Sequence, residues 1–301
     1  MSTEYNIFTP LIDSVKDLVL LGIEYYNKVP EKAEFNPDQK AYFGDIIIPI
    51  GVKSKRKKQY LRIGGEQSHT YIVGQTGSGK SNLVKVILTT LVNNYPTVKL
   101  WLFDYKRVEL SLFKNTRNCE VFEWSEEGIS EGIKNLFQLV LDRYEELEEQ
   151  GLTEAPLTMN SIICTIEEIS LMPKQDMKIL RRIMAISRAV HVYVIFTTQR
   201  PSNETLDNVV KSLTGNRICL KTDDEKNSII SLDKPGCEIL RGKGHGFMKS
   251  SGIISEFQAY HIDDGTVKDI VKKHSKPTSE LLVQKQNNNN DNINTEWVEK
   301  L

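Results

Sequence analysis

Residues 74–81 read Gly-Gln-Thr-Gly-Ser-Gly-Lys-Ser and match the pattern Gly-x-x-x-x-Gly-Lys-Ser/Thr at every fixed position. The stretch before them, 69–73, has the composition of a β-strand, and the stretch after them, 82–93, has that of a helix. Glycines let successive backbone N–H groups face a polyphosphate, and the start of a helix adds partial positive charge. The stretch therefore predicts a phosphate-binding loop for a nucleoside triphosphate, whereas a Gly/Ser turn without a ligand would not need both flanks. The predicted nucleotide-binding residues are Gly74, Gln75, Thr76, Gly77, Ser78, Gly79, Lys80 and Ser81.

Two residues of this loop have predicted chemical roles. We expect Lys80 to bridge the β- and γ-phosphates, and we expect the Ser81 hydroxyl to hold Mg²⁺. The sequence thus predicts a triphosphate and Mg²⁺ as ligands.

A pair of carboxylates follows a hydrophobic run: residues 162–168 read Ile-Ile-Cys-Thr-Ile-Glu-Glu. In a parallel sheet the end of such a strand lies at the carboxyl edge, beside the phosphate loop. We expect Glu167 to support Mg²⁺ through its water shell and Glu168 to polarise the attacking water. An acidic pair on the surface at a strand end is the alternative.

A second polar strand end comes at residues 192–201, Val-Tyr-Val-Ile-Phe-Thr-Thr-Gln-Arg-Pro. The run predicts a buried strand from which the amide of Gln199 emerges at the same edge of the sheet. Gln199 is a candidate for sensing the γ-phosphate or positioning water by hydrogen bonding. A polar strand cap with no further role is the other interpretation.

The composition excludes several classes of protein. Of 301 residues 39% are apolar, and 39 Lys and Arg balance 40 Asp and Glu. These values exclude a disordered chain and a globally basic nucleic-acid binder, so a nucleic-acid contact would need a local patch. The longest apolar stretches fall far below the ~20 residues of a membrane span. Four widely spaced cysteines, without a CxxC pair, predict reduced thiols in a cytoplasmic protein rather than a zinc site or disulfides.

The order of the predicted elements indicates an α/β fold. Short β-rich runs alternate with longer amphipathic runs between residues 66 and 263, which predicts a mainly parallel sheet flanked by helices. Predicted strands are 42–50, 70–73, 98–103, 120–124, 162–166, 192–197 and 217–221, and predicted helices are 12–26, 80–93, 129–149, 174–189 and 205–212.

We expect three regions. Residues 1–65 form a small N-terminal subdomain, residues 66–275 the main domain, and residues 276–301 a disordered tail that contains an Asn-rich tract. The basic stretch 53–58 is interpreted as a charged turn between two strands, with a phosphate-contacting patch as the alternative.

Several further segments resemble the FtsK/SpoIIIE-type DNA-pumping ATPases, a branch of the additional-strand P-loop motors. Residues 103–110, Phe-Asp-Tyr-Lys-Arg-Val-Glu-Leu, are similar to the family's "DPKrvEL" segment. The other segments that carry the resemblance, in family order, are Arg143-Tyr144, Ser-Arg-Ala-Val-His at 187–191, Thr-Gln-Arg-Pro at 198–201, and Leu-Asp-Lys-Pro-Gly at 232–236 with Gly-Lys-Gly at 242–244.

The resemblance implies a RecA-like ATPase that uses ATP and Mg²⁺ and forms a ring, of six subunits, around double-stranded DNA. ATP would lie between neighbours, and an arginine from one subunit would reach the γ-phosphate of the next. Arg188 is the candidate by motif position, and Arg217 is a second one. Cations in the region after the acidic pair would contact backbone phosphates; they are Lys174, Lys178, Arg181 and Arg182.

Departures from the family pattern refine the expectation. Glu167 stands where the family usually has Asp, and Leu171 stands where it tends to have another Asp, which predicts slow or conditional hydrolysis. The sequence shows neither a membrane anchor before the matching segments nor a winged-helix module after them. It therefore resembles the short forms of plasmids and integrative conjugative elements, which act as coupling ATPases for relaxase-bound DNA and transfer channels.

The expected activity is thus an ATP-dependent DNA translocase or conjugative coupling ATPase in the cytoplasm, with any membrane recruitment supplied by a partner. Two alternatives remain open. One is a protein-export motor of the type VII secretion kind, and the other is a nucleotide-binding assembly or adaptor module with weak or no hydrolysis.

Overall fold

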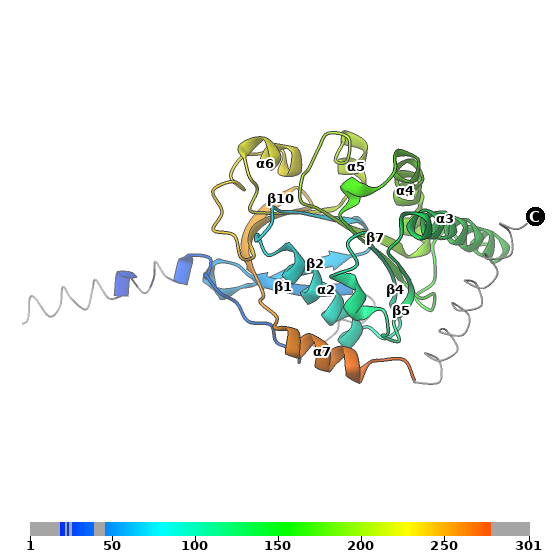
Figure 1. Cartoon of the computed structure of the whole chain (residues 1–301), viewed down its shortest axis with the longest axis horizontal. Coiled ribbons are helices and arrows are strands. Elements are labelled where there is room, and N and C mark those ends of the chain that lie inside the picture. The colour runs from blue at the N-terminus through cyan, green and yellow to red at the C-terminus, as the bar shows by residue number, and fades with distance from the viewer. Residues whose placement is uncertain (1–18, 22, 24–25, 39–45, 278–301) are drawn as a thin grey trace, which may run out of the picture.

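A ten-stranded sheet forms the centre of the computed structural model, which describes residues 19–21, 23, 26–38 and 46–277 (Figure 1). The strands are β1 (Ile46–Val52), β2 (Lys58–Ile63), β3 (Thr70–Val73), β4 (Lys99–Asp104), β5 (Cys119–Glu123), β6 (Ile162–Glu167), β7 (Val192–Thr198), β8 (Asn216–Leu220), β9 (His245–Ser250) and β10 (Ile253–Ala259). Their order across the sheet is β2-β1-β10-β9-β8-β3-β7-β6-β4-β5.

The half of the sheet from β8 to β5 is parallel throughout. Every residue of β6 and β7 is buried, as expected of central parallel strands that helices cover on both faces. β7 lies between β3 and β6, so the acidic strand is not the direct neighbour of the strand that precedes the phosphate loop. The carboxyl ends of all three strands still meet at one edge, and the predicted mainly parallel α/β fold of the additional-strand class is confirmed.

The other half of the sheet is antiparallel and was only partly expected from the sequence. β2, β9 and β10 were not predicted because polar and charged residues interrupt their apolar runs. β9 and β10 form a hairpin whose turn, Ser251-Gly252, is left-handed at both residues. A 3-10 helix, η1 (Ser54–Arg56), joins β1 to β2, so the basic stretch lies in the connection between two paired strands.

Helices cover both faces of the sheet. They are α2 (Lys80–Asn94), α3 (Glu126–Glu149), α4 (Lys174–Ile186), α5 (Asn208–Leu213), α6 (Glu225–Leu232) and α7 (Asp264–Lys273), with further 3-10 helices η2 (Leu110–Phe113), η3 (Ile169–Leu171) and η4 (Ser187–Val190). One apolar core lies beneath α2 and α7, and a second lies beneath α3 and α4 (Figure 1). The predicted helix at 174–189 is shorter than expected, because its last turn tightens into η4.

The sheet runs across the predicted boundary at residue 65. β1 pairs with β10, and Ile48, Ile50 and Leu61 pack into the same core as α2. The predicted helix at 12–26 falls largely outside the described residues, although residues 19–21, 23 and 26 within it are helical. Of the predicted tail, residues 278–301 also fall outside them.

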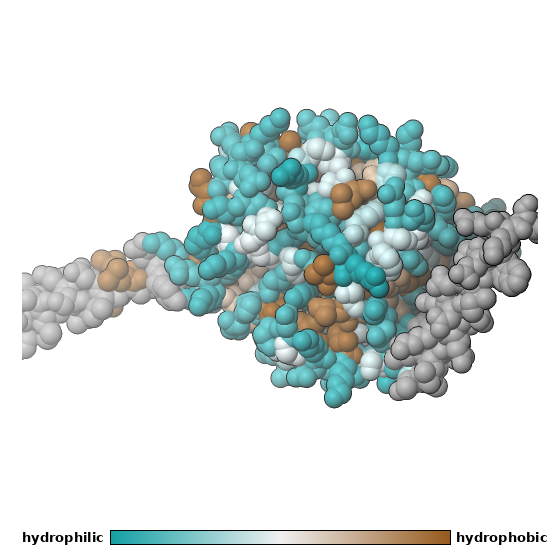
Figure 2. Space-filling view, in the orientation of Figure 1, coloured by the Kyte–Doolittle hydropathy of each residue, from teal (hydrophilic) through white to brown (hydrophobic). Residues whose placement is uncertain are grey.

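The surface drawn in Figure 2 is largely hydrophilic, with apolar residues in small groups. Within the described part of the chain, every helix is too short or too polar to cross a bilayer.

His69, just before β3, connects α4 to β7 from a buried position. Its Nε2 lies 2.9 Å from the carbonyl oxygen of Met184, and its Nδ1 accepts a hydrogen bond of 3.0 Å from the Val194 N–H. Burial lowers the pKa of His69 to about 4, although the Met184 carbonyl opposes the shift. The folded protein therefore holds a neutral imidazole where the unfolded chain would already be protonated.

We expect the free energy of unfolding to fall as the pH drops from 6.5 to about 4, because the unfolded state takes up a proton that folded His69 does not. One such proton corresponds to a slope of about 1.4 kcal/mol per pH unit. Urea unfolding across this interval measures the slope, and His69→Gln, which cannot titrate, should flatten it. Identical slopes in the two proteins would contradict the assignment.

Candidate functional site

The phosphate loop leaves the carboxyl end of β3 and enters α2 in the predicted position. Gly77 and Gly79 have positive φ angles of 78° and 99°, which lets the loop curl before the helix begins at Lys80. The loop is held from both sides: the Gly74 N–H donates to the Thr198 carbonyl at 3.3 Å, and the Gln75 N–H to the Lys221 carbonyl at 2.9 Å. The neighbouring strands β7 and β8 therefore fix the shape of the loop.

A second contact fixes the far side of the loop. The Gly244 N–H donates to the Ser78 carbonyl at 2.6 Å. At Gly79 a Cβ atom would lie 2.4 Å from the Gly244 nitrogen, so that position has no room for a side chain. The turn before β9 thus buttresses the phosphate loop.

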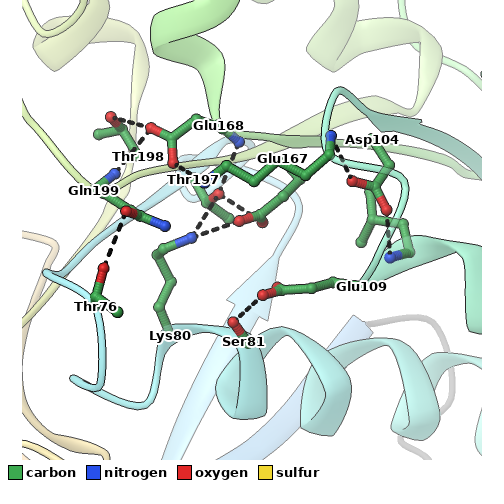
Figure 3. A network of polar contacts seen from close by, with 12 residues as sticks. Thr76, Lys80, Ser81, Asp104, Glu109, Glu167, Glu168, Thr197, Thr198 and Gln199 are labelled. Atoms are coloured by element: carbon green, nitrogen blue, oxygen red, sulfur yellow. Dashed lines mark hydrogen bonds and ion pairs between the residues drawn. The ribbon is translucent and has the colours of Figure 1, made fainter. Parts of the chain in front are cut away.

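Lys80 is buried and lies at the centre of the polar network in Figure 3. Its Nζ donates to Glu167 Oε1 at 2.5 Å and to Thr197 Oγ1 at 3.3 Å. Only 4% of Lys80 and 1% of Glu167 are exposed, so each charge depends on the other for compensation. The predicted lysine and the first predicted carboxylate are therefore in direct contact, across the strand that separates β3 from β6.

The two adjacent glutamates have different surroundings. Burial raises the pKa of Glu167, and Lys80 opposes this shift. Burial would also raise the pKa of Glu168, but hydrogen bonds from Lys106, Ser170 and the Gln199 N–H outweigh it and lower that pKa to about 2. Glu167 is thus the carboxylate that pairs with buried Lys80, whereas Glu168 is the carboxylate that its hydrogen bonds keep ionised.

An unusual backbone conformation brings both carboxylates to the same network. Successive residues of a strand point to opposite faces. Glu168 leaves the strand with φ 59° and ψ 63°, a left-handed conformation that costs a non-glycine residue about 1–2 kcal/mol. The Glu168 N–H donates to Thr197 Oγ1 at 3.1 Å, and Glu167 Oε2 accepts from the same hydroxyl at 2.6 Å. Thr197 therefore ties the two glutamates together.

Gln199 completes the edge of the site nearest the loop. Its Oε1 accepts a hydrogen bond of 3.3 Å from Thr76 Oγ1, and its N–H donates to Glu168 Oε1 at 3.0 Å (Figure 3). These contacts bring together the predicted Lys80, Glu167, Glu168 and Gln199 around the phosphate loop.

A cavity of about 700 Å³ opens over this edge. The phosphate loop, Glu109, Gln199 and Lys243 line one part of it, and the segment 259–264 lines the other. Sites for small ligands typically have volumes of about 300–1,000 Å³, so the cavity has room for a nucleotide whose phosphates lie on the loop.

The donor set fits Mg²⁺, the metal predicted from the sequence. Ser81 Oγ donates to Glu109 Oε1, and the other oxygen of Glu109 is buried without a hydrogen-bond partner among the described residues. Mg²⁺ takes hard oxygen ligands and is usually bound through one or two protein groups plus substrate phosphates and water. Ser81, with Glu167 through its water shell, would hold it here.

Several residues of the network were not predicted as site residues. They are Asp104, Lys106, Glu109, Thr197 and Thr198. Asp104, Lys106 and Glu109 all lie in the segment 103–110, for which the sequence indicates only a resemblance to the family's "DPKrvEL" segment. The polar end of a buried strand at Asp104 is the signal that would have identified this segment.

The two candidate arginines lie away from this edge. Arg188 is exposed on η4, just before β7 begins, and Arg217 lies near the start of β8. Because β7 runs parallel to β3, Arg188 lies at the amino edge of the sheet, roughly 20 Å of strand from the phosphate loop. Arg217 pairs with Tyr71 of β3, so it lies roughly 10 Å of strand from the loop. Arg217 donates to Asp233 Oδ2 at 2.7 Å.

The predicted DNA-contacting cations lie on α4. Lys174 and Lys178 are exposed, and Lys174 is 3.8 Å from Glu204 in a pair that is largely open to solvent. Arg181 pairs with Asp207 at 2.8 Å, and the Arg182 guanidinium lies 4.8 Å from the centre of the Phe137 ring. Lys174 and Lys178 are therefore the cations of this set most accessible to a phosphate backbone.

The loop, the buried lysine and the carboxylates at parallel strand ends define the class of this protein as a P-loop nucleoside triphosphatase. The FtsK/SpoIIIE family model matches residues 39–235, and the chain belongs to this family of P-loop ATPases. The chain is 30% identical over 308 residues to the DNA translocase FtsK of Chlamydia muridarum (strain MoPn / Nigg), an alignment that covers 86% of this chain and 39% of that protein. The chain thus spans well under half the length of this relative.

Solved structures share the fold at lower identity. The conjugation coupling protein TcpA of pCW3, solved as a monomer with ATPγS, superposes with a TM-score of 0.69 at 20% identity over 82% of this chain and 75% of that one. ATPases 2 and 3 of EssC from Geobacillus thermodenitrificans give a TM-score of 0.70 at 16% identity over 82% of this chain and 50% of that one. Both comparisons confirm the predicted fold.

The buttress behind the phosphate loop can be tested with two matched alanine variants. We expect Gly79→Ala to lower the free energy of unfolding by about 3 kcal/mol or more, because it adds a backbone clash to an unfavourable left-handed φ. Gly77→Ala meets nothing within 4 Å and should cost about 1 kcal/mol. Chemical denaturation measures both losses in the free energy of unfolding. Equal losses in the two variants would contradict the close packing of Gly244 against Gly79.

Proposed function

We propose that this chain binds and hydrolyses ATP with Mg²⁺ and uses the energy to move or deliver double-stranded DNA. The observation that carries the proposal is the convergence of Lys80, Glu167, Glu168 and Gln199 on the phosphate loop. Family membership supports ATP as the substrate, and the name of the relative, DNA translocase FtsK, supports DNA as the cargo. The structural neighbour TcpA, a conjugation coupling protein, supports conjugative delivery as the setting.

The roles of the residues follow from their positions. Backbone N–H groups of the loop and the Lys80 ammonium bind the phosphates, which replace part of the compensation that Glu167 now provides. Ser81, with Glu167 through the water shell, would hold Mg²⁺, which would neutralise charge on the phosphates. Glu168 accepts the hydrogen bond of the attacking water, and Gln199 orients that water or the γ-phosphate from the neighbouring strand end.

Contacts to DNA would be made to its backbone. Lys174 and Lys178 project from α4, which follows the acidic pair by a short 3-10 turn. Such cations bind phosphates without reading the base sequence, and their affinity falls steeply with salt. By the same proposal a relaxase or transfer-channel protein would be the partner in conjugative delivery.

We further propose that copies of the chain assemble into a ring, of six subunits, with ATP between neighbours. Arg188 is exposed and lies at the opposite edge of the sheet from its own phosphate loop, so it could serve only a neighbour's site. Arg217 is the second candidate, and its ion pair with Asp233 would have to open first.

The cytoplasm is the proposed compartment, with any recruitment to a membrane supplied by a partner protein. All four cysteines are free and buried, as in proteins of reducing compartments.

We expect ATP turnover that rises when duplex DNA is added and loses this stimulation as salt increases. Lys80→Ala should lower turnover at least about 100-fold, because a preorganised cation at the developing charge is lost. Phosphate release with and without DNA measures both effects, and Lys134→Ala, which removes an exposed lysine on α3, is the matched control.

Other outcomes would select the alternatives. Lys80→Ala with unchanged turnover would contradict the site itself. An active ATPase that duplex DNA neither binds nor stimulates would favour the protein-export motor. ATP binding without turnover, even with DNA, would favour the assembly or adaptor module, consistent with Glu167 and Leu171 at positions where the family has aspartates.

The arginine assignment has its own test. We expect Arg188→Ala to retain ATP binding but lose turnover by about 10³-fold or more, as when an arginine finger is removed. Mixing this variant with Lys80→Ala subunits should restore part of the activity, because a hybrid site then has an intact loop and an intact arginine. Unchanged turnover in Arg188→Ala, with loss in Arg217→Ala, would transfer the role to Arg217.

A further inference from the structure

The loop between β4 and η2, residues 105–109, contacts the site at two places and is anchored by a buried acid. Asp104, at the end of β4, is fully buried and accepts hydrogen bonds from the Lys106 N–H at 3.2 Å and the Leu110 N–H at 3.0 Å. These bonds fix both ends of the loop. Glu109 then accepts from Ser81 Oγ and holds the loop against the start of α2.

Lys106 reaches from this loop to Glu168. Its Nζ donates to Glu168 Oε2 at 2.8 Å, and 38% of Lys106 but only 6% of Glu168 is exposed. A partly exposed lysine thus contacts a buried carboxylate whose proposed role is to accept a hydrogen bond from the attacking water.

The other oxygen of Glu168 is also engaged. Oε1 accepts from Ser170 Oγ at 2.7 Å, from Thr198 Oγ1 at 3.1 Å and from the Gln199 N–H at 3.0 Å. With Lys106 on Oε2, both oxygens are bound to protein donors. Because Oε1 already accepts three hydrogen bonds, Oε2 is the oxygen left to bind water, and the Lys106 ammonium occupies one of its two acceptor sites and draws charge away from it.

Lys106 is the contact best placed to break. Ser170, Thr198 and Gln199 lie within two residues of Glu168 or on the neighbouring strand end, where the sheet holds them. Lys106 belongs to a loop whose outer side is exposed, with Val108 at 67%. The adjacent Arg107 has a left-handed φ of 54°, and its guanidinium lies 4.1 Å from the centre of the Trp124 ring, which is itself 44% exposed.

We propose that Lys106 is a positioning residue that restrains Glu168, and that contact with the exposed loop 105–108 during DNA engagement releases the restraint. The inference rests on the proposed ATPase function and adds to it a reason for low turnover without DNA. The sign of the effect distinguishes Lys106 from a catalytic lysine, because removing a restraint raises the unstimulated rate.

The test compares Lys106→Met, Lys106→Arg and the parent chain. Lys106→Met keeps the length of the side chain but removes the donor, and should raise DNA-free turnover roughly tenfold, the rate equivalent of one charge-assisted hydrogen bond. DNA-stimulated turnover should stay close to that of the parent, so the stimulation ratio falls. Lys106→Arg retains a cation within reach of Glu168 and should restore the low basal rate.

Two controls separate this effect from a general one. Lys114→Met removes an exposed lysine that lies over the Phe122 ring, and should leave both rates unchanged. Lys106→Met combined with Glu168→Gln should be inactive with and without DNA, because the raised rate acts through Glu168. Binding of a fluorescent ATP analogue should be the same in Lys106→Met and the parent.

Two results for Lys106→Met would contradict the restraint. Lower turnover in Lys106→Met under both conditions would make Lys106 a contributor to catalysis, and equal rates in Lys106→Met and the parent would make the ion pair incidental. A parent chain that binds ATP without turnover would overturn the proposed function. In that case a rate that stays zero in Lys106→Met would overturn the restraint as well, whereas turnover that appears only in Lys106→Met would support it.

Discussion

The arrangement of the site depends on one buried ion pair, Lys80 with Glu167. Both charges are almost completely removed from solvent, so the pair is stable only while Thr197 and the surrounding strand ends satisfy the remaining hydrogen bonds. The same feature makes the pair suitable for a phosphate site, because an incoming anion can take over the compensation of Lys80. Glu167 would then be available on the side where Ser81 lies.

The sheet explains why residues so distant in sequence meet here. β7 lies between β3 and β6, so Thr197 and Thr198 at its end, and Gln199 just after it, contact the phosphate loop on one side and the two glutamates on the other. The parallel strands deliver polar groups to one edge, and the antiparallel strands supply the turn that supports the loop from behind through Gly244. Each half of the mixed sheet thus contributes a different part of the site.

The sequence was sufficient for the features encoded locally. The phosphate loop, the strands at 70–73 and 162–166 and the polar ends at Glu167, Glu168 and Gln199 could be predicted from short patterns, and the structure brings these residues together. The contacts of Lys106 with Glu168 and of Glu109 with Ser81 could not, because 62 and 28 residues separate the partners and the order of strands across the sheet brings them together. The hairpin of β9 and β10 was missed because polar and charged residues interrupt the apolar runs of both strands. The roles of Arg188 and of the α4 cations stay predictions.

The most direct measurement is a crystal structure of the chain with Mg²⁺ and a non-hydrolysable ATP analogue. The account predicts a triphosphate on residues 74–81, with the Lys80 ammonium at the γ-phosphate and the metal on the Ser81 hydroxyl. A nucleotide bound elsewhere, or Lys80 still paired only with Glu167 beside an occupied cavity, would contradict it.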